Sequence, residues 1–448
     1  MIDSTLSFLY GDKLDVDERE PVFAFDVARF LGGPADGGVL SYGILMPSPA
    51  FWVQLLSFMV LGVMLGLVAS VVNYNLIVLR RRQSTSAATD PTIEAMMVAF
   101  GITIPLCIAF PYAIIAVFGV RNYIIKFCLA TISPVLTMFH TIEAVFGTSP
   151  RCAETSFARY ALYMASPLEV CFDQRSCRPI KVKVTRTLRA LGDFALFLVV
   201  LGLYQSIFGP SRYQPFSAGA DFPPLDSYSH SFKDLLRPGH LGNILRPGHL
   251  GNNLVAALLL QLYLTTFCLG LKAVTNLVAG IETKEVMSDA LFGSSSPSEF
   301  WGRNWNTLIH GVLKRAIYKP ALRFLPKALA ATAAFLSSGL FHEYILSALF
   351  YFPNREIDAN GQCQHCYVPS YGRNVIFFLI NAFIIAVEHK VGGASIFAWI
   401  KSNLPIPIVS LFVVSTALPF AHFFTADYIL SEYFVHGQMG FPLIVSLH

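Results

Sequence analysis

The residues best suited to chemistry are His342 and Glu343, which stand side by side in an otherwise apolar stretch that begins at Ala330. An ionisable side chain in the middle of a membrane span costs at least ~2.5–3.5 kcal/mol, so it normally faces a cavity or a partner. Neighbouring residues on a helix point about 100° apart, so the two side chains cannot both face one substrate. Because histidine accepts a proton near neutral pH, we expect His342 to face a reaction chamber and Glu343 to tie the helix to a neighbour.

A second segment of unusual composition precedes that helix. At helical spacing its polar residues form one stripe, namely Glu299, Arg303, Asn306, His310 and Lys314. Its apolar residues form the opposite face, namely Trp301, Trp305, Leu308 and Val312. The pattern predicts a Trp-anchored amphipathic helix along the membrane interface. This helix leads into the one that carries His342, where Ser338 lies one turn before the histidine.

Several catalytic patterns are missing from the sequence. Leu346 stands four residues after His342, so the second histidine of a zinc-protease helix is lacking. No Gly-x-Ser-x-Gly nucleophile elbow, P-loop or dinucleotide glycine fingerprint occurs. Cys363 and Cys366 form a lone pair, for which a disulfide or free thiols fit better than zinc. The sequence therefore predicts no metal site.

The elements that position these residues are membrane spans. Of 448 residues, 54% are hydrophobic and only 13% are charged, about half the ~25% charged share of soluble domains. This composition excludes a secreted disulfide scaffold, a disordered regulator and a nucleic-acid-binding protein. The fold class is an all-α, polytopic integral membrane helical bundle with interfacial amphipathic helices around a central chamber. With roughly 20 apolar residues per span, we expect about eight spans, in a range of seven to nine: 51–79, 96–119, 123–147, 190–208, 254–280, 328–352, 373–388 and 404–430.

Basic residues predict how the spans are oriented. Of 32 Lys and Arg residues, 20 fall in the loops 80–95, 150–189, 281–327 and 389–403, which share one side. Short cytoplasmic loops retain positive charge, so we expect this side to be cytoplasmic and both termini to lie opposite. The N-terminus lacks a basic stretch followed by a short apolar core, and no cleaved signal peptide is expected.

A tandem repeat and the cysteines are interpreted without chemistry. Residues 236–243 and 245–252 repeat one sequence with a Pro-Gly turn, which predicts a duplication in a surface loop and no ligand for His240 or His249. Four cysteines lie in or beside apolar segments, where cysteine usually packs as a small hydrophobe. These four are Cys107, Cys128, Cys171 and Cys268.

The two segments resemble a known family at three motifs. These read Phe300-Trp301-Gly-Arg303-Asn304-Trp305-Asn306, then Tyr318-Lys319-Pro320, then Ser338-Gly-Leu-Phe-His342-Glu343. They look like the membrane-bound O-acyltransferases, in the wax synthase-like branch related to the sterol and diacylglycerol acyltransferases. The 36 residues from Asn306 to His342 are similar to that family's spacing. The resemblance covers about 290–390, with a weaker echo at 140–173, and Asn304 departs from it where a second arginine is expected.

The resemblance implies acyl transfer from acyl-CoA to the hydroxyl of a lipophilic alcohol, which is a fatty alcohol, a sterol or a terpenoid. His342 would be the general base, and Asn306 would donate to the thioester carbonyl or the developing oxyanion. Direct attack requires no acyl-enzyme. The resemblance implies acyl-CoA or acetyl-CoA as co-substrate, and no bound cofactor is expected. Substrate contacts are expected from Trp301, Arg303, Trp305, His310, Ser338 and Glu343.

Other functions stay open beside this one. One is an acetyl-CoA-dependent acetyltransferase of a specialised-metabolite alcohol within the same family. Another is a proton-coupled membrane transporter, which predicts two related halves with broken helices, and the sequence shows no such symmetry. A non-catalytic scaffold is disfavoured because both motif positions, Asn306 and His342, are intact.

The expected partners are the two substrates and the lipid bilayer, without nucleic acid, and the expected location is the endoplasmic reticulum membrane.

The sequence divides into three parts. Residues 1–50 form a non-cytoplasmic segment, 51–430 form the transmembrane domain with its motif-bearing core at 290–390, and 431–448 form a C-terminal tail.

Overall fold

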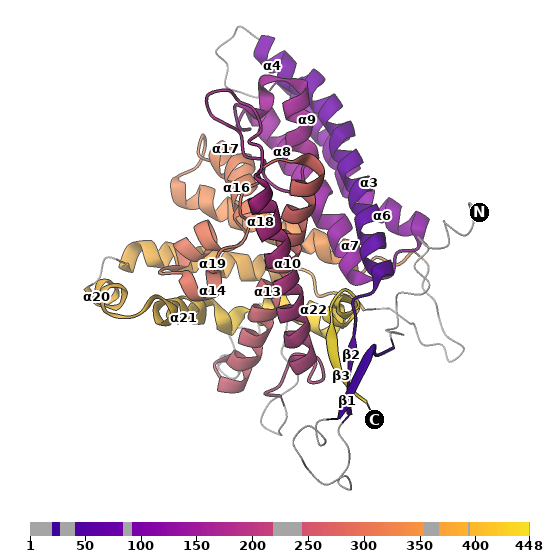
Figure 1. Cartoon of the computed structure of the whole chain (residues 1–448). Helices are drawn as coiled ribbons and strands as arrows, with labels where there is room; N and C mark the ends of the chain where they lie inside the picture. The colour runs from indigo at the N-terminus through magenta and orange to yellow at the C-terminus, as the bar shows by residue number, and fades with distance from the viewer. Residues whose placement is uncertain are drawn as a thin grey trace, which may run out of the picture.

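Long apolar helices dominate the computed structural model, which describes residues 20–26, 41–83, 92–217, 244–353, 367–392 and 395–447. Within these ranges, seven helices are long and apolar enough to cross a membrane (Figure 1). Four of them are single helices: α10 (Val184–Phe208), α13 (Pro247–Ala279), α18 (Lys327–Leu349) and α19 (Arg373–Val391). A fifth begins with α3 (Pro49–Asn73) and ends with α4 (Leu79–Gln83). Helix α19 packs along α18, as α10 does along α13.

Three of the seven spans contain a π-helical turn, and in the span Pro49–Gln83 this turn is Tyr74–Val78. In the span Ile93–Phe118, a π-helical turn joins α5 (Ile93–Val98) to α6 (Ile104–Phe118). In the span Tyr123–Phe146, the π-helical turn Thr131–Val135 contains Pro134 and joins α7 (Tyr123–Ala130) to α8 (Leu136–Phe146). This span is the most buried of the seven, so protein surrounds it and lipid does not. That surrounding accommodates the interrupted backbone and the buried side chains of Lys126, His140 and Glu143.

The last predicted span, 404–430, is not straight. It consists of Ile406–Phe420 and His422–Leu430, which are bent by 65°. The first part is α21 (Ile406–Ala417) with a short 3-10 turn, and the second part is α22 (His422–Leu430). Pro419 lies in the turn and has no backbone N–H to continue the helical hydrogen bonds. The membrane-crossing helices therefore number seven, or eight with this bent pair, among the described residues.

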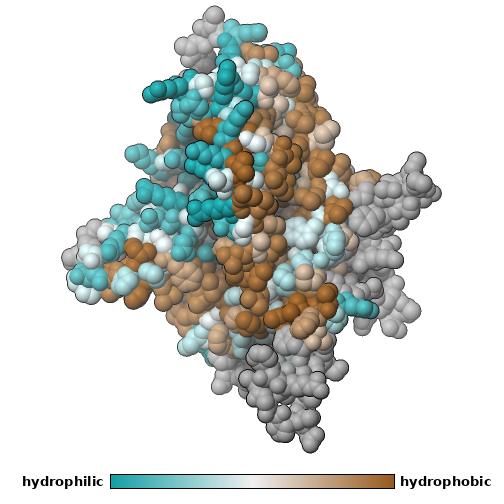
Figure 2. Space-filling view, in the orientation of Figure 1, coloured by the Kyte–Doolittle hydropathy of each residue, from teal (hydrophilic) through white to brown (hydrophobic). Residues whose placement is uncertain are grey.

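The outer surface of the bundle is apolar. Figure 2 shows hydrophobic residues over much of the visible face and hydrophilic ones gathered toward the end that carries α4, α9 (Phe157–Ala165) and α17 (Lys319–Ala321). On α10 large apolar side chains are exposed, among them Leu196, Leu203 and Ile207. Exposed apolar area on this scale marks contact with lipid. The chain is a multi-pass membrane protein, as its composition predicts.

The prediction of an all-α fold misses a small β-sheet. Strands β1 (Phe23–Asp26), β2 (Ser41–Leu45) and β3 (Leu443–Leu447) form an antiparallel sheet in that order. Phe23 pairs with Ile44, and Leu45 pairs with Leu443. A short helix, α23 (Tyr433–Gln438), precedes β3. The sheet joins residues near the two chain ends (Figure 1), a pairing that is invisible in either short strand alone.

The second copy of the repeat does not form a surface loop. Its residues from Pro247 onward are the first turns of α13, and the side chain of His249 is buried, with Nε2 beside the Asn253 amide. Proline is favourable at the first position of a helix, where no N–H is needed. The predicted start of this span at 254 is therefore too late. The first copy, 236–243, and Cys363 and Cys366 lie outside the described residues.

Candidate active site

A cavity of about 570 Å³ lies inside the bundle. Its volume falls within the range of small-molecule binding sites. Most of the lining is apolar, and it comes from α7, α13, α18, α19, α21 and α22, together with the motif segment that precedes α18. Four predicted site residues on the motif segment and two on α18 line it: Trp301, Trp305, Asn306, His310, Ser338 and His342. The fold thus brings together residues that lie as far as 41 positions apart in the sequence.

His342 lies in an aromatic surround on the wall formed by α18. Its ring centroid is 4.2 Å from that of Phe341, 4.8 Å from Phe378 and 5.1 Å from Phe424. Its Nδ1 lies 2.7 Å from the carbonyl oxygen of Ser338. A carbonyl only accepts hydrogen bonds, so Nδ1 carries the proton and Nε2 keeps its lone pair. The imidazole is thereby held as the tautomer in which Nε2 can accept a proton.

Glu343 faces the other way, toward α19. Its Oε1 accepts hydrogen bonds from the backbone N–H groups of Asn374 at 2.9 Å and Val375 at 3.4 Å. These are N–H groups of the first turn of α19, where a carboxylate satisfies free donors and the helix dipole. Glu343 does not line the cavity formed by the described residues. The structure therefore separates the two neighbours as expected, but it does not bring Glu343 to the substrate contacts.

The predicted amphipathic helix is broken in the middle. It consists of α15 (Pro297–Glu299), the π-helical turn Phe300–Asn304, and α16 (Thr307–Leu313), with the break at Trp305 and Asn306. The polar stripe from Glu299 to Lys314 is therefore not continuous. The backbone of the break is hydrogen-bonded to another segment, with Thr307 N–H donating to the Val286 carbonyl at 2.8 Å. This pairing pulls the chain out of the helical path.

Asn306 sits at the break in a left-handed conformation, with φ of 41°. Asparagine tolerates this region better than most residues. Its Oδ1 accepts from Ile309 N–H at 3.2 Å and so caps α16. Among the described residues Nδ2 has no acceptor, and the side chain lines the cavity. Asn306 therefore combines a structural oxygen with an amide donor available to a bound molecule.

The two motif tryptophans are fixed by aromatic and polar contacts. Trp301 Nε1 donates to Asn381 Oδ1 at 3.1 Å. Trp305 stacks on Phe300, with ring centroids 5.5 Å apart and planes inclined by 16°. The motif position Asn304, where the family pattern has a basic residue, donates through Nδ2 to Ser294 Oγ at 2.9 Å. The motif segment is therefore connected to α19 through Asn381 and to the loop that precedes the motif segment through Ser294.

Basic groups gather along one wall of the cavity, which we call the motif wall and which consists of residues 306–318. Asn306, His310 and Lys314 are spaced by four residues, and all three line the cavity. Burial, and then the positive charges of Lys314 and Arg315, lower the pKa of His310 below its ordinary value. Arg303, Lys314 and Lys319 are exposed, and Arg303 is not part of the described cavity lining.

A buried ion network backs the motif wall, and sequence reasoning did not assign it. Arg315 Nε lies 3.0 Å from Glu143 Oε1, and its Nη1 lies 3.2 Å from Glu169 Oε1. Tyr163 Oη donates to Glu143 Oε2, and Lys284 Nζ lies 2.7 Å from Glu169 Oε1. The sequence signals were Glu143 inside an apolar span and the weak family echo at 140–173. The sequence did not show that Arg315 is the partner of Glu143, because the two residues lie 172 positions apart.

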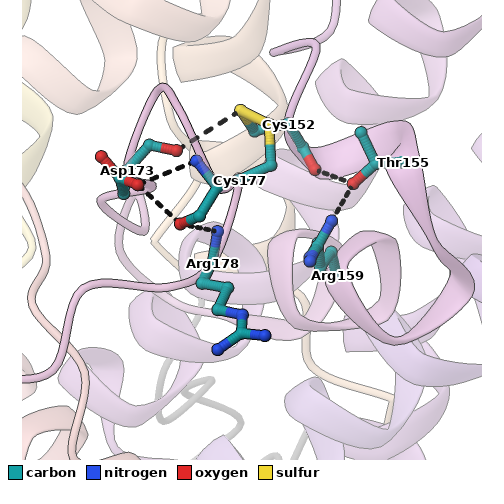
Figure 3. The surroundings of a disulfide bond; sticks show 7 residues. Cys152, Thr155, Arg159, Asp173, Cys177 and Arg178 are labelled. Atoms are coloured by element: carbon teal, nitrogen blue, oxygen red, sulfur yellow. Dashed lines mark hydrogen bonds between the residues drawn. A yellow bond between two sulfur atoms is a disulfide. The ribbon is translucent and has the colours of Figure 1, made fainter.

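A disulfide-closed segment delivers Glu169 to this network. Cys152 and Cys177 are bonded, and we call residues 152–177 the strap (Figure 3). A tight turn ends the strap, where Cys177 N–H donates to the Asp173 carbonyl at 2.8 Å. Val170 bridges to Thr283, which holds the strap against the segment that leads to the motif wall. Pro167 and Leu168, next to Glu169, line the cavity.

The fold and site define a class of protein: a polytopic helical membrane protein with an apolar internal cavity, lined by His342, whose Nε2 is free to accept a proton. No group of three or more His, Cys, Asp or Glu side chains that could hold a metal ion occurs in the part of the chain that the structure describes. The polar side chains that line the cavity include hydroxyl, amide, imidazole and ammonium groups.

Comparison with known proteins finds similarity to one family over part of the chain. Residues 285–358 match the membrane bound O-acyl transferase family. An acyl-CoA–sterol O-acyltransferase of Arabidopsis thaliana is 29% identical over 133 residues, which are 28% of this chain and 34% of that protein. Two probable long-chain-alcohol O-fatty-acyltransferases of the same plant are 33% and 36% identical, over 19% and 16% of this chain and 26% and 23% of their own lengths. Over these segments the chain is similar to membrane-bound O-acyltransferases that act on sterols and long-chain alcohols by their names. It is matched over about a third or less of the length of these relatives.

Proposed function

We propose that this protein is an acyl-CoA-dependent O-acyltransferase that esterifies a lipophilic alcohol. The observation that carries the proposal is His342, held by the Ser338 carbonyl with its Nε2 lone pair free, on the wall of an apolar cavity. A base of this kind suits proton transfer from a hydroxyl group, and an apolar surround keeps the imidazole neutral until it reacts.

The reaction balances with two substrates and one base. The alcohol oxygen attacks the thioester carbon while its proton passes to Nε2 of His342. The carbon–sulfur bond then breaks, and the CoA thiolate leaves and takes up the proton from the imidazolium. The products are an ester and free CoA, and His342 returns to its starting state. No nucleophilic side chain has to form a covalent intermediate in this sequence.

Asn306 is proposed as the donor to the carbonyl oxygen. Its Oδ1 is held by Ile309 N–H, which fixes the amide plane and leaves Nδ2 available in the cavity. A donor fixed before the reaction stabilises the developing oxyanion without reorganising, and in a dry cavity this effect is larger than in water. The capping bond therefore supports the proposed role and does not compete with it.

Acyl-CoA is proposed to approach along the motif wall. Lys314 lines the cavity and is exposed, while Arg303 and Lys319 lie exposed on the same segment. Ammonium and guanidinium groups pair well with the phosphates of CoA. His310, neutral at pH 7 because its pKa is lowered, lies between Asn306 and Lys314, in reach of the pantetheine arm. These basic residues belong to the side that we expect to be cytoplasmic, where acyl-CoA is found.

The acceptor is proposed to be a fatty alcohol, a sterol or a terpenoid alcohol. The cavity's apolar lining supports a lipophilic molecule, with Trp301, Trp305 and Ser338 among its contacts. The names of the relatives, sterol and long-chain-alcohol acyltransferases, belong to the same range of acceptors. We place the enzyme in the endoplasmic reticulum membrane, where such alcohols and acyl-CoA meet.

Expression in a host that lacks its own neutral-lipid acyltransferases tests the proposal. The cells are supplied with a fatty alcohol, a sterol or a terpenoid alcohol, and their lipids are compared by mass spectrometry with those of cells carrying an empty vector. A new ester of one acceptor supports the proposal, and its acyl part distinguishes a long-chain acyltransferase from an acetyltransferase. Absence of any new ester, with the protein present in the membrane, contradicts it.

A further inference from the structure

The network behind the motif wall concentrates charge in a buried place. Glu143 is fully buried, and the side chains of Glu169 and Arg315 are 9% and 13% exposed. Two carboxylates face one guanidinium, and Lys284 adds a second positive charge from the edge. Such charges are stable in a protein interior only when all of them are paired. Loss of the Arg315 guanidinium therefore leaves the carboxylates of Glu143 and Glu169 without their shared positive partner.

Arg315 is also tied to the strap side through its backbone. Its carbonyl oxygen accepts from Thr148 Oγ1 at 2.7 Å. Gly311, one turn earlier, leaves room for the network, because a Cβ there would lie 3.3 Å from Glu169 Oε2. The helical segment of residues 307–318 is thus fixed along one side by the network. Its other side presents His310 and Lys314 to the cavity.

The network connects two parts of the cavity lining that come from distant segments of the chain. Lys314 precedes Arg315 in the chain, and Leu168 precedes Glu169. Both Lys314 and Leu168 line the cavity. The bond between Arg315 and Glu169 therefore sets how far apart these two parts of the lining stand. His342 lies on α18, which contributes no side chain to the network.

We propose that Arg315, through Glu143 and Glu169, is a positioning residue that sets the motif wall for acyl-CoA binding. The inference rests on the proposed function, since it concerns the donor side of that cavity. The turn Lys314–Tyr318 packs against α18, but no hydrogen bond or ion pair joins the network to His342 among the described residues. We therefore expect the network to act on the donor side and not on the alcohol beside His342. The network acts on the donor's KM and leaves the acceptor's KM unchanged.

Steady-state kinetics of the purified full-length protein test this inference with Arg315→Lys and Glu169→Gln. Lysine keeps the charge but cannot reach both carboxylates as the arginine fork does. Glutamine keeps the shape of Glu169 and removes its charge. We expect KM for acyl-CoA to rise about tenfold in both variants, the scale of one charge-assisted hydrogen bond. KM for the alcohol should stay within about twofold of the wild type.

A matched control is Arg186→Ala, which removes an exposed Arg–Glu pair with Glu282 on the same side of the molecule. It should leave both KM values unchanged. Size-exclusion profiles and melting temperatures check that the variants are folded. If Arg315→Lys does not fold, Glu169→Gln alone tests the inference. Equal changes in both KM values, or none, overturn the inference while the proposed function stands. A folded wild type that forms no ester overturns the proposed function and the inference with it.

Discussion

Asn306 shows how one side chain serves fold and chemistry through different atoms. Its Oδ1 caps α16, and its Nδ2 faces a cavity without an acceptor from the described residues. Asn306→Asp separates the two roles, because aspartate still caps the helix but offers no amide donor. We expect the variant to fold as the wild type does and to lose at least about 100-fold in kcat. Initial rates beside thermal unfolding measure both effects, and a near-normal rate would reduce Asn306 to a helix cap.

His310 provides a prediction for pH. Its pKa is lowered from 6.5 by burial and by Lys314 and Arg315, so below pH 6.5 the unfolded chain takes up the proton before the folded one does. Protonation then favours unfolding, and this contribution to stability is complete above pH 6.5 and is lost as the pH falls toward the lowered pKa. The melting temperature of His310→Gln should fall less between pH 7 and pH 5 than that of the wild type. Parallel curves for the two proteins would contradict it.

Individual site residues were predictable where an ionisable residue stands within an apolar stretch of sequence. An ionisable pair inside an apolar stretch marked His342 and Glu343, and adjacency alone required that they face different ways. The structure places Glu343 at the first turn of α19, away from the cavity. Arg315 was not predictable, since a basic residue in a basic loop is ordinary until Glu143 and Glu169 are placed beside it.

Among the elements, α18 and α19 approach each other closely at Gly339. A Cβ at this position would lie 2.6 Å from Val375 Cα, which is backbone and cannot yield easily. Gly339→Ala should therefore destabilise the protein by about 1–3 kcal/mol and loosen the contact of Glu343 with α19. The matched control is Gly192→Ala in α10, where nothing lies within 4 Å. Thermal unfolding compares the two, and equal melting temperatures would show that the helices can separate at no cost.

The strap tests the orientation of the spans. Its cysteines, Cys152 and Cys177, lie on the side where basic loops predict the cytoplasm, and cytosolic thiols are normally kept reduced. Because the structure bonds these two cysteines, we expect them to react with a maleimide in opened cells only after a reductant is added, in a variant whose other cysteines are serine. That result would place the strap on an oxidising side and reverse the orientation that the basic loops predict. Cys152→Ala/Cys177→Ala is the unlabelled control, and labelling without reductant would contradict the bond and keep the strap on the cytoplasmic side.

The positions of helices were predicted well where a single property, the length of an apolar stretch, determines them. Apolar length fixed the positions of the seven spans, with errors of a few residues except at α13 and α10, whose polar first turns hide their starts. The motif segment was predicted as one helix because its polar and apolar residues alternate at helical spacing. It is broken because its backbone at Thr307 is bonded to Val286, a tertiary contact that periodicity does not contain.

At the scale of the whole molecule, the fold encloses a cavity of about 570 Å³ between helices from the middle and end of the chain. Composition predicted a membrane bundle, and the family resemblance at Asn306 and His342 implied that the two residues share a site. The sheet that joins β2 to β3 was beyond sequence reasoning, since these short strands lie 398 residues apart between Leu45 and Leu443. Long-range pairing of this kind is decided by the assembled fold.

The central claim is that this cavity transfers acyl groups with His342 as the base. Its most direct test is the initial rate of ester formation from radiolabelled acyl-CoA and the accepted alcohol, measured with purified wild type and His342→Ala at equal amounts of folded protein. The account predicts that the wild type forms the ester and that the variant loses about 100-fold to 10,000-fold in rate. A rate in His342→Ala close to that of the wild type would contradict it.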